Sequence, residues 1–257
     1  MLTVTFIRHG QSQDNVKSIW AGWKDAPLSE LGVKQAAALG KAFSGTKIDA
    51  FYVSDLLRAH DTGKAVFDAH SSPKPPFTVN PKLREQHFGI AEGQPWVIDA
   101  PPDQSYDEMF LQGIFPVLKG RDEKFPQGES LNDLARRTDQ AIAECVLPHL
   151  AAEGDVHIAL ASHGLCISEL VASLLRLDPD SRRDISYAGL FNTAWTRAVV
   201  TLKDGKAPLD AHNPPPLTVQ ITHVNNDDHL LTLHVAEEPI DENSAAARAF
   251  FGGKAAI

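Results

Sequence analysis

The sequence contains only two cysteines, Cys145 and Cys166, among its 257 residues. Two cysteines are too few for the disulfide framework of a small secreted protein, so they favour a reducing compartment. Long apolar runs are also missing, since no stretch approaches the roughly 18 residues that a membrane-spanning helix needs. Met1 leads directly into the strand-like run at residues 2–7 rather than into a signal peptide. We therefore expect a cytoplasmic protein without a membrane partner.

Basic residues are outnumbered by acidic ones. The chain has 24 Lys and Arg against 33 Asp and Glu, a formal net charge of −9 at pH 7 with histidine neutral. General nucleic-acid binding needs a basic face that displaces counterions, so this class of function is disfavoured. A local basic pocket for a small anionic substrate remains compatible with the composition. The content of 43% hydrophobic and 22% charged residues is typical of a soluble globular protein.

Short apolar runs alternate along the chain with longer stretches of helical period. The predicted strands are residues 2–7, 49–53 and 156–161, and the predicted helices are residues 29–44, 55–69, 130–150 and 165–177. Ser29 is a candidate N-cap, and Ser130 with Asp133 forms a capping-box pattern. This alternation predicts an α/β fold, a three-layer α/β/α sandwich with a mostly parallel sheet.

Residues 94–128 interrupt the alternation, because they contain five prolines and little periodicity. We interpret them as a loop-rich insertion into a single domain that spans residues 1–257. The insertion carries Lys119, Arg121 and Lys124. One hypothesis makes it a lid whose cations meet a second anionic group of a substrate, and the alternative makes these residues solvated surface charges.

The C-terminal part of the chain follows a different pattern. The runs at 194–202, 217–224 and 230–235 alternate by two residues, so we expect strands that pair at one edge of the sheet. Residues 203–216 form a long connection between the first two of these runs. The tail from about residue 236 is rich in Ala and Glu, and we expect it to be loosely attached.

Two predicted strands end in a His-Gly pair, in Arg8-His9-Gly10 and in Ser162-His163-Gly164. Ligands of open α/β sheets bind at the carboxyl ends of strands, so both histidines are expected at one ligand site. Gly164 permits a tight turn, and the backbone N–H groups that open the following helix suit an anion. Either histidine alone could be an ordinary core or turn residue, but the two together indicate a site.

Two further residues fit the same end of the sheet. Arg58 lies about one helical turn beyond the end of the strand at 49–53, and its planar guanidinium suits bidentate binding of phosphate. The alternative is a solvent-facing helix arginine. Glu85 precedes the segment Phe88-Gly89, and a carboxylate there could act as a general acid.

The ordered set of motifs resembles the histidine phosphatase superfamily, with its phosphoglycerate-mutase-like fold. The set covers roughly residues 1–200. The matching segments are Arg8-His9-Gly10-Gln11-Ser12 with Asn15, Asp25-x-Pro27-Leu28-Ser29, Ser54-Asp55-Leu56-x-Arg58-Ala59, Leu83-Arg84-Glu85, Phe88-Gly89 with Glu92-Gly93, Gly128-Glu129-Ser130 and Ser162-His163-Gly164.

The resemblance implies a role for each matched residue. His9 resembles the nucleophile that forms a phosphohistidine. Arg8, Arg58 and His163 resemble the pocket that holds the phosphate oxygens, assisted by Asn15. Glu85 resembles the proton donor to the leaving alkoxide and the later base toward water. Positioning and charge stabilisation are what phosphoryl transfer mostly needs, so these residue types suit it.

No metal and no cofactor is expected. The remaining histidines show no ligand spacing typical of zinc, and we interpret most of them as surface or turn residues, with His87 nearest the pocket. We interpret Cys166 as a small buried side chain rather than a redox group.

The family resemblance leaves several activities open. Cofactor-dependent mutases of the family carry a Trp-Arg-Arg-containing insertion, and residues 94–128 lack that motif, which favours a phosphatase. The expected substrate is a small phosphorylated metabolite, and the layout is similar to that of fructose-2,6-bisphosphatase-type proteins. The alternatives are phosphoglycerate-mutase-type transfer and a non-catalytic member that binds a phosphorylated ligand.

Overall fold

The computed structural model describes residues 1–17, 19–71, 73–97, 103–203 and 214–233. Six strands form one sheet in the order β3-β2-β6-β1-β7-β8. The strands are β1 Leu2–Arg8, β2 Ala50–Val53, β3 Phe77–Val79, β6 Val156–Ser162, β7 Trp195–Leu202 and β8 Leu217–Asn226. Strands β3, β2, β6 and β1 are parallel, whereas β7 and β8 are antiparallel and lie at one edge. The predicted mostly parallel sheet is confirmed, and so is the predicted pairing of the runs at 194–202 and 217–224 at one edge.

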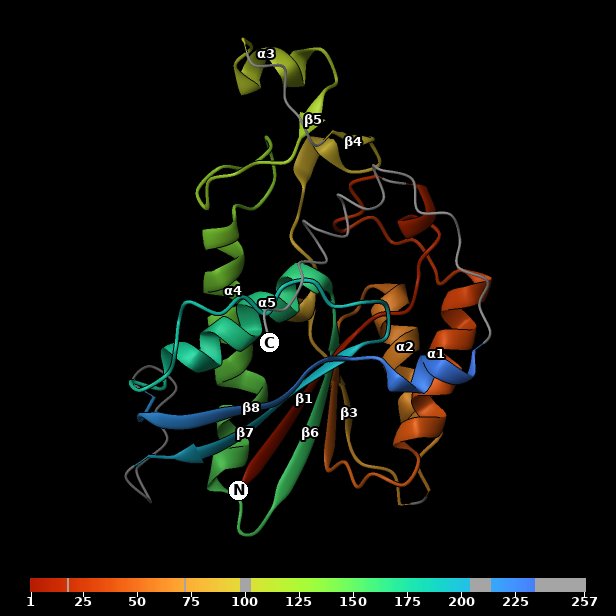
Figure 1. The fold of residues 1–257 in the computed structure, drawn as a ribbon, viewed down its shortest axis with the longest axis vertical. Coiled ribbons are helices and arrows are strands. Elements are labelled where there is room, and N and C mark those ends of the chain that lie inside the picture. The colour runs from red at the N-terminus through yellow and green to blue at the C-terminus, as the bar shows by residue number, and fades with distance from the viewer. Residues whose placement is uncertain (18, 72, 98–102, 204–213, 234–257) are drawn as a thin grey trace.

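Helices cover both faces of the sheet, which confirms the three-layer α/β/α arrangement (Figure 1). Helices α1 Glu30–Phe43 and α2 Leu57–Asp68 pack on one face, around Phe43, Phe51 and Val66. Helices α4 Leu131–Cys145 and α5 Gly164–Arg176 pack on the other face, where the larger core cluster lies. Burial of these apolar faces is the main source of stability for such a fold.

Two serines fix the starts of the long helices. Ser29 Oγ accepts the N–H of Gly32 at the start of α1. Ser130 and Asp133 form a reciprocal capping box at the start of α4, and the backbone N–H of Ser130 is the main cause that lowers the pKa of Asp133 to about 2. Both caps follow the sequence pattern.

Helix α4 is shorter than the predicted helix at 130–150. It ends at Cys145, and the 3-10 helix η4 Leu147–Ala151 follows. Pro148 explains the change, because proline has no N–H to donate to the carbonyl four residues earlier. Further single turns of 3-10 helix are η1 Asn15–Lys17, η2 Pro81–Leu83 and η3 Gly89–Ala91.

The insertion at 94–128 is more ordered than its sequence predicts. It contains the paired strands β4 Trp96–Val97 and β5 Phe115–Pro116 and the short helix α3 Tyr106–Leu111 (Figure 1). Phe110, Phe115 and Phe125 contact one another, so the insertion has its own aromatic cluster. Residues 98–102 lie outside the described residues.

The prediction of a strand at 230–235 is wrong for residues 230–233, the part of it that the structure describes. Residues Asp228–Thr232 form the 3-10 helix η5 instead, and its His229 hydrogen-bonds to Thr193 Oγ1. This tertiary contact outweighs the short alternating pattern, which is ambiguous over so few residues. Residues 204–213 of the predicted connection, residues 234–235 and the tail from 236 lie outside the described residues. Within the described residues, no helix is long and apolar enough to cross a membrane.

Candidate active site

His9 and His163 follow the carboxyl ends of two neighbouring parallel strands. Arg8, the last residue of β1, pairs with Ser162, the last residue of β6, so the two histidines leave the sheet side by side. Their ring centroids are 5.0 Å apart. Exposure is 3% for His9 and 0% for His163, so both rings are buried. The structure therefore brings together the two histidines that the sequence singles out.

The tautomer of His9 is set by its own loop. The Nδ1 atom lies 2.7 Å from the carbonyl oxygen of Gly10, which can only accept, so Nδ1 carries the proton and Nε2 carries a lone pair. Burial, and then the charges of Arg58 and Arg8, hold the pKa of His9 well below its ordinary value. A neutral ring with a free Nε2 lone pair is the state that a nucleophile needs.

His163 presents a different nitrogen. Its Nε2 lies 2.9 Å from Ser54 Oγ, and that oxygen also accepts the N–H of Leu56. The hydroxyl proton of Ser54 is therefore available to His163 Nε2, which leaves the proton of the ring on Nδ1. This Nδ1 atom is buried and has no hydrogen-bond partner among the described residues. Burial and the charge of Arg58 lower the pKa of His163 well below its ordinary value.

Two arginines bring positive charge to the same end of the sheet. Arg58 is 1% exposed, and its Nη1 and Nη2 donate to the carbonyl oxygens of Lys24 and Gly22 at 3.0 and 2.7 Å. Its Nε is buried with no partner in the described part of the chain. Arg8 donates from Nη1 to the carbonyl oxygen of Leu190. A buried donor without a partner is costly, so such groups indicate a ligand site.

Glu85 lies against the first turn of α5. Its Oε1 accepts the N–H groups of Gln86 and Cys166 at 3.0 Å each, and its Oε2 accepts that of Leu165 at 3.3 Å. The positive end of the helix dipole thus faces this carboxylate. Gly164 begins the helix, as expected, but two of the N–H groups proposed for an anion already contact Glu85.

Asn15 is connected to His9 through Asn192. Asn15 is exposed, and its Oδ1 accepts the N–H of Ser12 at 3.0 Å. The Nδ2 of Asn192 donates to Asn15 Oδ1 at 3.4 Å and to the carbonyl oxygen of His9 at 3.1 Å. The N–H of Thr193 also donates to that carbonyl. The backbone of His9 is therefore held from the loop before β7.

The loop that contacts Arg58 is held by a close approach to Glu92. Gly22 has a φ of +49°, and a Cβ atom there would lie 2.2 Å from Glu92 Oε1, so only glycine fits. The same oxygen accepts the N–H groups of Trp23 and Phe88. His87 packs against Trp23 with ring centroids 4.6 Å apart, which places it beside this loop, as the sequence suggested.

Two cations of the insertion pair with carboxylates of α4 and α5. Arg121 Nη2 lies 2.9 Å from Glu169 Oε1 of α5, and Lys124 Nζ lies 3.2 Å from Asp133 Oδ2 of α4. Lys119 is exposed. Two of the three cations in the lid hypothesis are thus paired with carboxylates, which favours the alternative of ordinary surface charges for those two.

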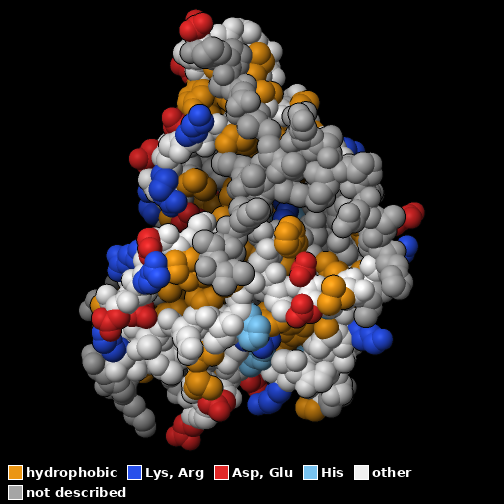
Figure 2. All heavy atoms as spheres, in the orientation of Figure 1, with side chains coloured by type: hydrophobic (Ala, Val, Ile, Leu, Met, Phe, Trp, Pro, Cys, Tyr) orange, Lys and Arg blue, Asp and Glu red, His pale blue; other side chains and the backbone are white. Residues whose placement is uncertain are grey.

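Charges of both signs mix over α4 and α5, at the left edge of the view in Figure 2. A shallow groove there is lined by Arg121, Arg136, Arg176, Asp139 and Glu169. Each of its guanidinium groups is paired with a carboxylate, so the groove has a mixed charge rather than a purely positive one. No cluster of three or more His, Cys, Asp or Glu side chains suited to a metal occurs among the described residues.

Two contacts at the site were missed by sequence reasoning. Arg137 of α4 donates to the carbonyl oxygen of Glu85 at 2.9 Å, and Trp23 Nε1 donates to the same oxygen at 2.7 Å. Arg137 follows Arg136 in a helix of ordinary amphipathic pattern, so nothing in the sequence distinguishes it from a surface arginine. Trp23 belongs to a quoted segment, but its contact with Glu85 has no sequence signal.

Comparison with known proteins gives the following matches. A model of the histidine phosphatase superfamily, branch 1, matches residues 4–213. The 2,3-bisphosphoglycerate-dependent phosphoglycerate mutase 2 of Gloeobacter violaceus is 31% identical over 180 residues, which cover 70% of this chain and 78% of the mutase. The solved structure of mycobacterial hydrolase 1 is 26% identical, with a TM-score of 0.66, covering 87% of this chain and 98% of its own. A mycobacterial glucosyl-3-phosphoglycerate phosphatase in complex with VO3 is 25% identical, with a TM-score of 0.62 and the same coverage.

Proposed function

Because the chain belongs to the histidine phosphatase superfamily, we propose that it hydrolyses phosphate monoesters through a phosphohistidine on His9. The observation that carries the proposal is the bond from His9 Nδ1 to Gly10 O, which leaves Nε2 unprotonated beside His163 and Arg58. The proposed substrate is a small phosphorylated metabolite. No metal or cofactor takes part in the proposed reaction.

In the first step, His9 Nε2 attacks the phosphorus atom in line with the leaving oxygen. Arg8, Arg58 and His163 Nδ1 hold the non-bridging oxygens, and their donors stabilise the charge that spreads over them. The bond from phosphorus to the ester oxygen breaks as the bond to Nε2 forms. Glu85 donates its proton to the departing alkoxide.

In the second step, Glu85 accepts a proton from a water molecule that attacks the phosphohistidine. The bond from phosphorus to Nε2 breaks, inorganic phosphate leaves, and Glu85 is protonated again for the next cycle. Two steps through a covalent intermediate replace one difficult step, which is the advantage of nucleophilic catalysis. Asn15 supports the loop that carries His9, through Asn192.

A phosphoglycerate-mutase activity is the second candidate, because a 31% identical relative is named as such a mutase. A mutase returns the phosphoryl group to a second site on a bound acceptor and needs cationic groups for that acceptor. Arg121 and Lys124 of the insertion are paired with Glu169 and Asp133, so they support a hydrolase more than a mutase. Because a structurally similar protein is named a glucosyl-3-phosphoglycerate phosphatase, glycerate derivatives belong among the substrates to be assayed.

Three measurements on the whole protein test the proposal. Sugar phosphates, phosphoglycerates, glucosyl-3-phosphoglycerate, phosphoamino acids and nucleotides are assayed for release of inorganic phosphate, with and without EDTA. We expect hydrolysis that survives EDTA, inhibition by vanadate and an acid-labile, alkali-stable phosphoenzyme. Activity that EDTA abolishes and Mg²⁺ or Zn²⁺ restores contradicts the proposal. Conversion of 3- to 2-phosphoglycerate that exceeds phosphate release favours the mutase, and binding without turnover favours a non-catalytic member.

A further inference from the structure

Arg137 uses its whole guanidinium to hold the segment that carries Glu85. Its Nη1 donates to the carbonyl oxygens of Lys82 and Arg84 at 2.8 Å each, and its Nη2 donates to that of Glu85 at 2.9 Å. Its Nε and Nη2 donate to the two carboxylate oxygens of Glu129 at 2.9 and 2.7 Å. These contacts occupy the five N–H groups of an arginine, and three of them go to carbonyl oxygens of residues 82–85.

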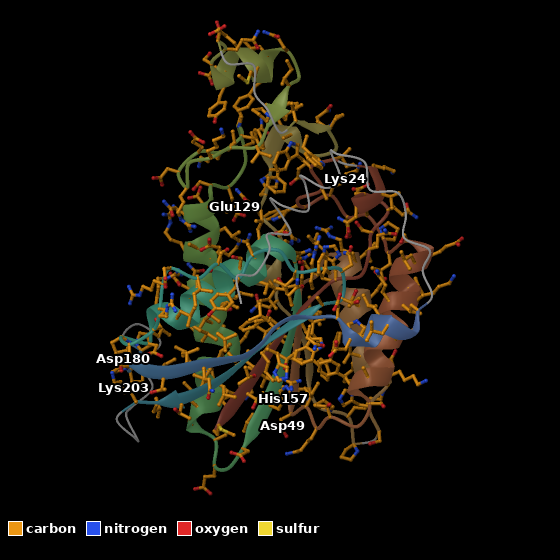
Figure 3. All side chains as sticks on the ribbon, viewed as in Figure 1. Lys24, Asp49, Glu129, His157, Asp180 and Lys203 are labelled. Atoms are coloured by element: carbon orange, nitrogen blue, oxygen red, sulfur yellow. The ribbon has the colours of Figure 1, made fainter. Side chains whose placement is uncertain are left out.

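Glu129 holds the same segment from the other direction. It is labelled in Figure 3, above the sheet, near the start of α4. Its Oε2 accepts the N–H of His87 at 3.0 Å, its carbonyl oxygen accepts Nε2 of Gln86 at 2.7 Å, and its N–H donates to the carbonyl of His87. Arg137 and Glu129 thus form a clamp on residues 82–87.

Most of the clamped segment lies outside regular secondary structure. Between η2, which ends at Leu83, and η3, which begins at Gly89, the backbone forms no helix or strand. The Glu85 carbonyl receives hydrogen bonds from Arg137 and Trp23, while its carboxylate faces the first turn of α5. The position of that carboxylate therefore depends on these contacts to its backbone together with its own bonds to N–H groups of α5.

We propose that Arg137, oriented by Glu129, is a positioning residue for proton transfer by Glu85. The inference rests on the proposed function, since it assigns a support to the proposed acid. Arg137 contacts the main chain rather than the carboxylate, so it acts on where Glu85 lies. A misplacement of about 1 Å at a reacting group can cost about 10²-fold in rate.

Proton donation matters most when the leaving group is a poor one. An alkyl phosphate has a strongly basic alkoxide that needs the proton of Glu85, whereas p-nitrophenolate leaves without it. Loss of the clamp should therefore slow alkyl phosphate hydrolysis far more than p-nitrophenyl phosphate hydrolysis. A merely structural role would reduce both rates together, because unfolding removes active protein for every substrate.

The experiment compares five variants with the wild type on glycerol phosphate and p-nitrophenyl phosphate. Glu85→Gln is the reference for a missing proton donor, and Arg137→Met, Arg137→Lys and Glu129→Gln change the clamp. Arg136→Met is the matched control, because Arg136 is the neighbouring arginine, 69% exposed, and pairs only with Asp133 among the described ion pairs, whereas Arg137 is 14% exposed. Thermal unfolding is recorded for each variant.

We expect Arg137→Met to lose about 10–100-fold more kcat on glycerol phosphate than on p-nitrophenyl phosphate. Arg137→Lys keeps the charge but not the five donors, so we expect an intermediate split. Arg136→Met should match the wild type on both substrates. If Arg137→Met does not fold, Arg137→Lys and Glu129→Gln carry the test, with the same direction of split.

If the Arg137 and Glu129 variants lose kcat equally on the two substrates while Glu85→Gln loses more on glycerol phosphate, the positioning role is overturned and Glu85 remains the acid. The absence of a split in Glu85→Gln overturns Glu85 as the acid and the clamp with it. A wild-type protein without phosphatase activity overturns the proposed function itself.

Discussion

The neighbouring strands β1 and β6 have histidines at both of their ends. The carboxyl end carries His9 and His163, and the amino end carries His157, which lies with Asp49 near the foot of the sheet in Figure 3. Burial is the largest cause of a lowered pKa for all three rings, and it takes that of His157 to about 4. Lowered pKa values therefore do not distinguish the two ends.

The hydrogen-bond partners distinguish them. The Nε2 atom of His157 lies 2.8 Å from Thr5 Oγ1. The ring also hydrogen-bonds to the backbone of Lys47. Arg197 donates to the same threonine oxygen and lies over the Trp195 ring. At the other end, buried nitrogens of His163 and Arg58 have no partner among the described residues. Converging donors without partners, rather than lowered pKa values, indicate where a ligand binds.

The strongest test of this contrast removes one histidine from each end. His9→Ala should reduce turnover by at least about 10⁴-fold, since it removes the nucleophile, and it should prevent covalent phosphate labelling. His157→Ala should keep turnover within about threefold of the wild type at a temperature where both are folded. Steady-state kinetics and labelling with a ³²P-phosphate ester measure the two effects. Labelling that persists in His9→Ala would reassign the nucleophile.

The next test removes one arginine from each end. Arg58→Met should lower kcat/KM by about 10²–10³-fold, because a buried cationic donor is lost from the proposed phosphate pocket. The same variant should lose vanadate inhibition. Arg197→Met removes a partly buried guanidinium from the amino end and should change kcat/KM less than about threefold. Comparable losses in the two variants would show that the contrast between the ends has no catalytic meaning.

A third test uses the dependence of stability on pH. Below pH 6.5 an unfolded histidine binds a proton, but folded His157 stays neutral down to about pH 4. The unfolded state then binds more protons, so His157 makes the free energy of unfolding fall as the pH falls from 6.5 to 4. His157→Gln should reduce the loss between pH 7.5 and 5.0 by about 1–2 kcal/mol, after allowance for the partial exposure of the ring. Urea unfolding at both pH values measures this, and equal losses in the two proteins would refute it.

The smallest expected effect concerns Cys166, beside Glu85. Its backbone N–H, and not its thiol, contacts the carboxylate, and burial raises the pKa of the thiol to about 12. Cys166→Ala should therefore change kcat less than about threefold, and iodoacetamide should not inactivate the wild type within an hour. Rapid inactivation from which vanadate protects would give the thiol a role that its surroundings do not support.

The sequence predicts the site at the carboxyl ends of the parallel strands better than it predicts the insertion and the contacts between distant segments. His9 and His163 could be placed together because the carboxyl ends of parallel strands meet at one edge, a rule of topology that needs no coordinates. Arg58 follows from its place about one helical turn past the end of a strand. Glu85 is a candidate acid from its place before Phe88-Gly89, and the resemblance adds the role of proton donor to the leaving group. The capping pattern at Ser130 also predicted the start of a helix correctly.

The rest depends on contacts between distant segments. Trp20 Nε1 donates to the carbonyl of Phe115 in the insertion, whose short helix α3 is too brief to show a period. Ser105 and Glu108 form a capping box within a stretch whose prolines indicate a loop. Arg137 acquires its partners only when α4 packs beside residues 82–87. The sequence predicts the strand that carries His157, but it does not show that the ring bonds to Thr5 and the backbone N–H to Asp49.

The pairing of β1 also bears on how the protein folds. Leu2, near the very start of the chain, pairs with Val156 on one side and Val200 on the other. Both partners of strand β1 thus lie far along the sequence from it, a topology of high contact order that slows folding. The loop that carries His9 is also held by Asn192 and Thr193, which lie just before β7. Recovery of activity during refolding should thus lag behind the formation of helices and report the closure of the longest loops in the chain.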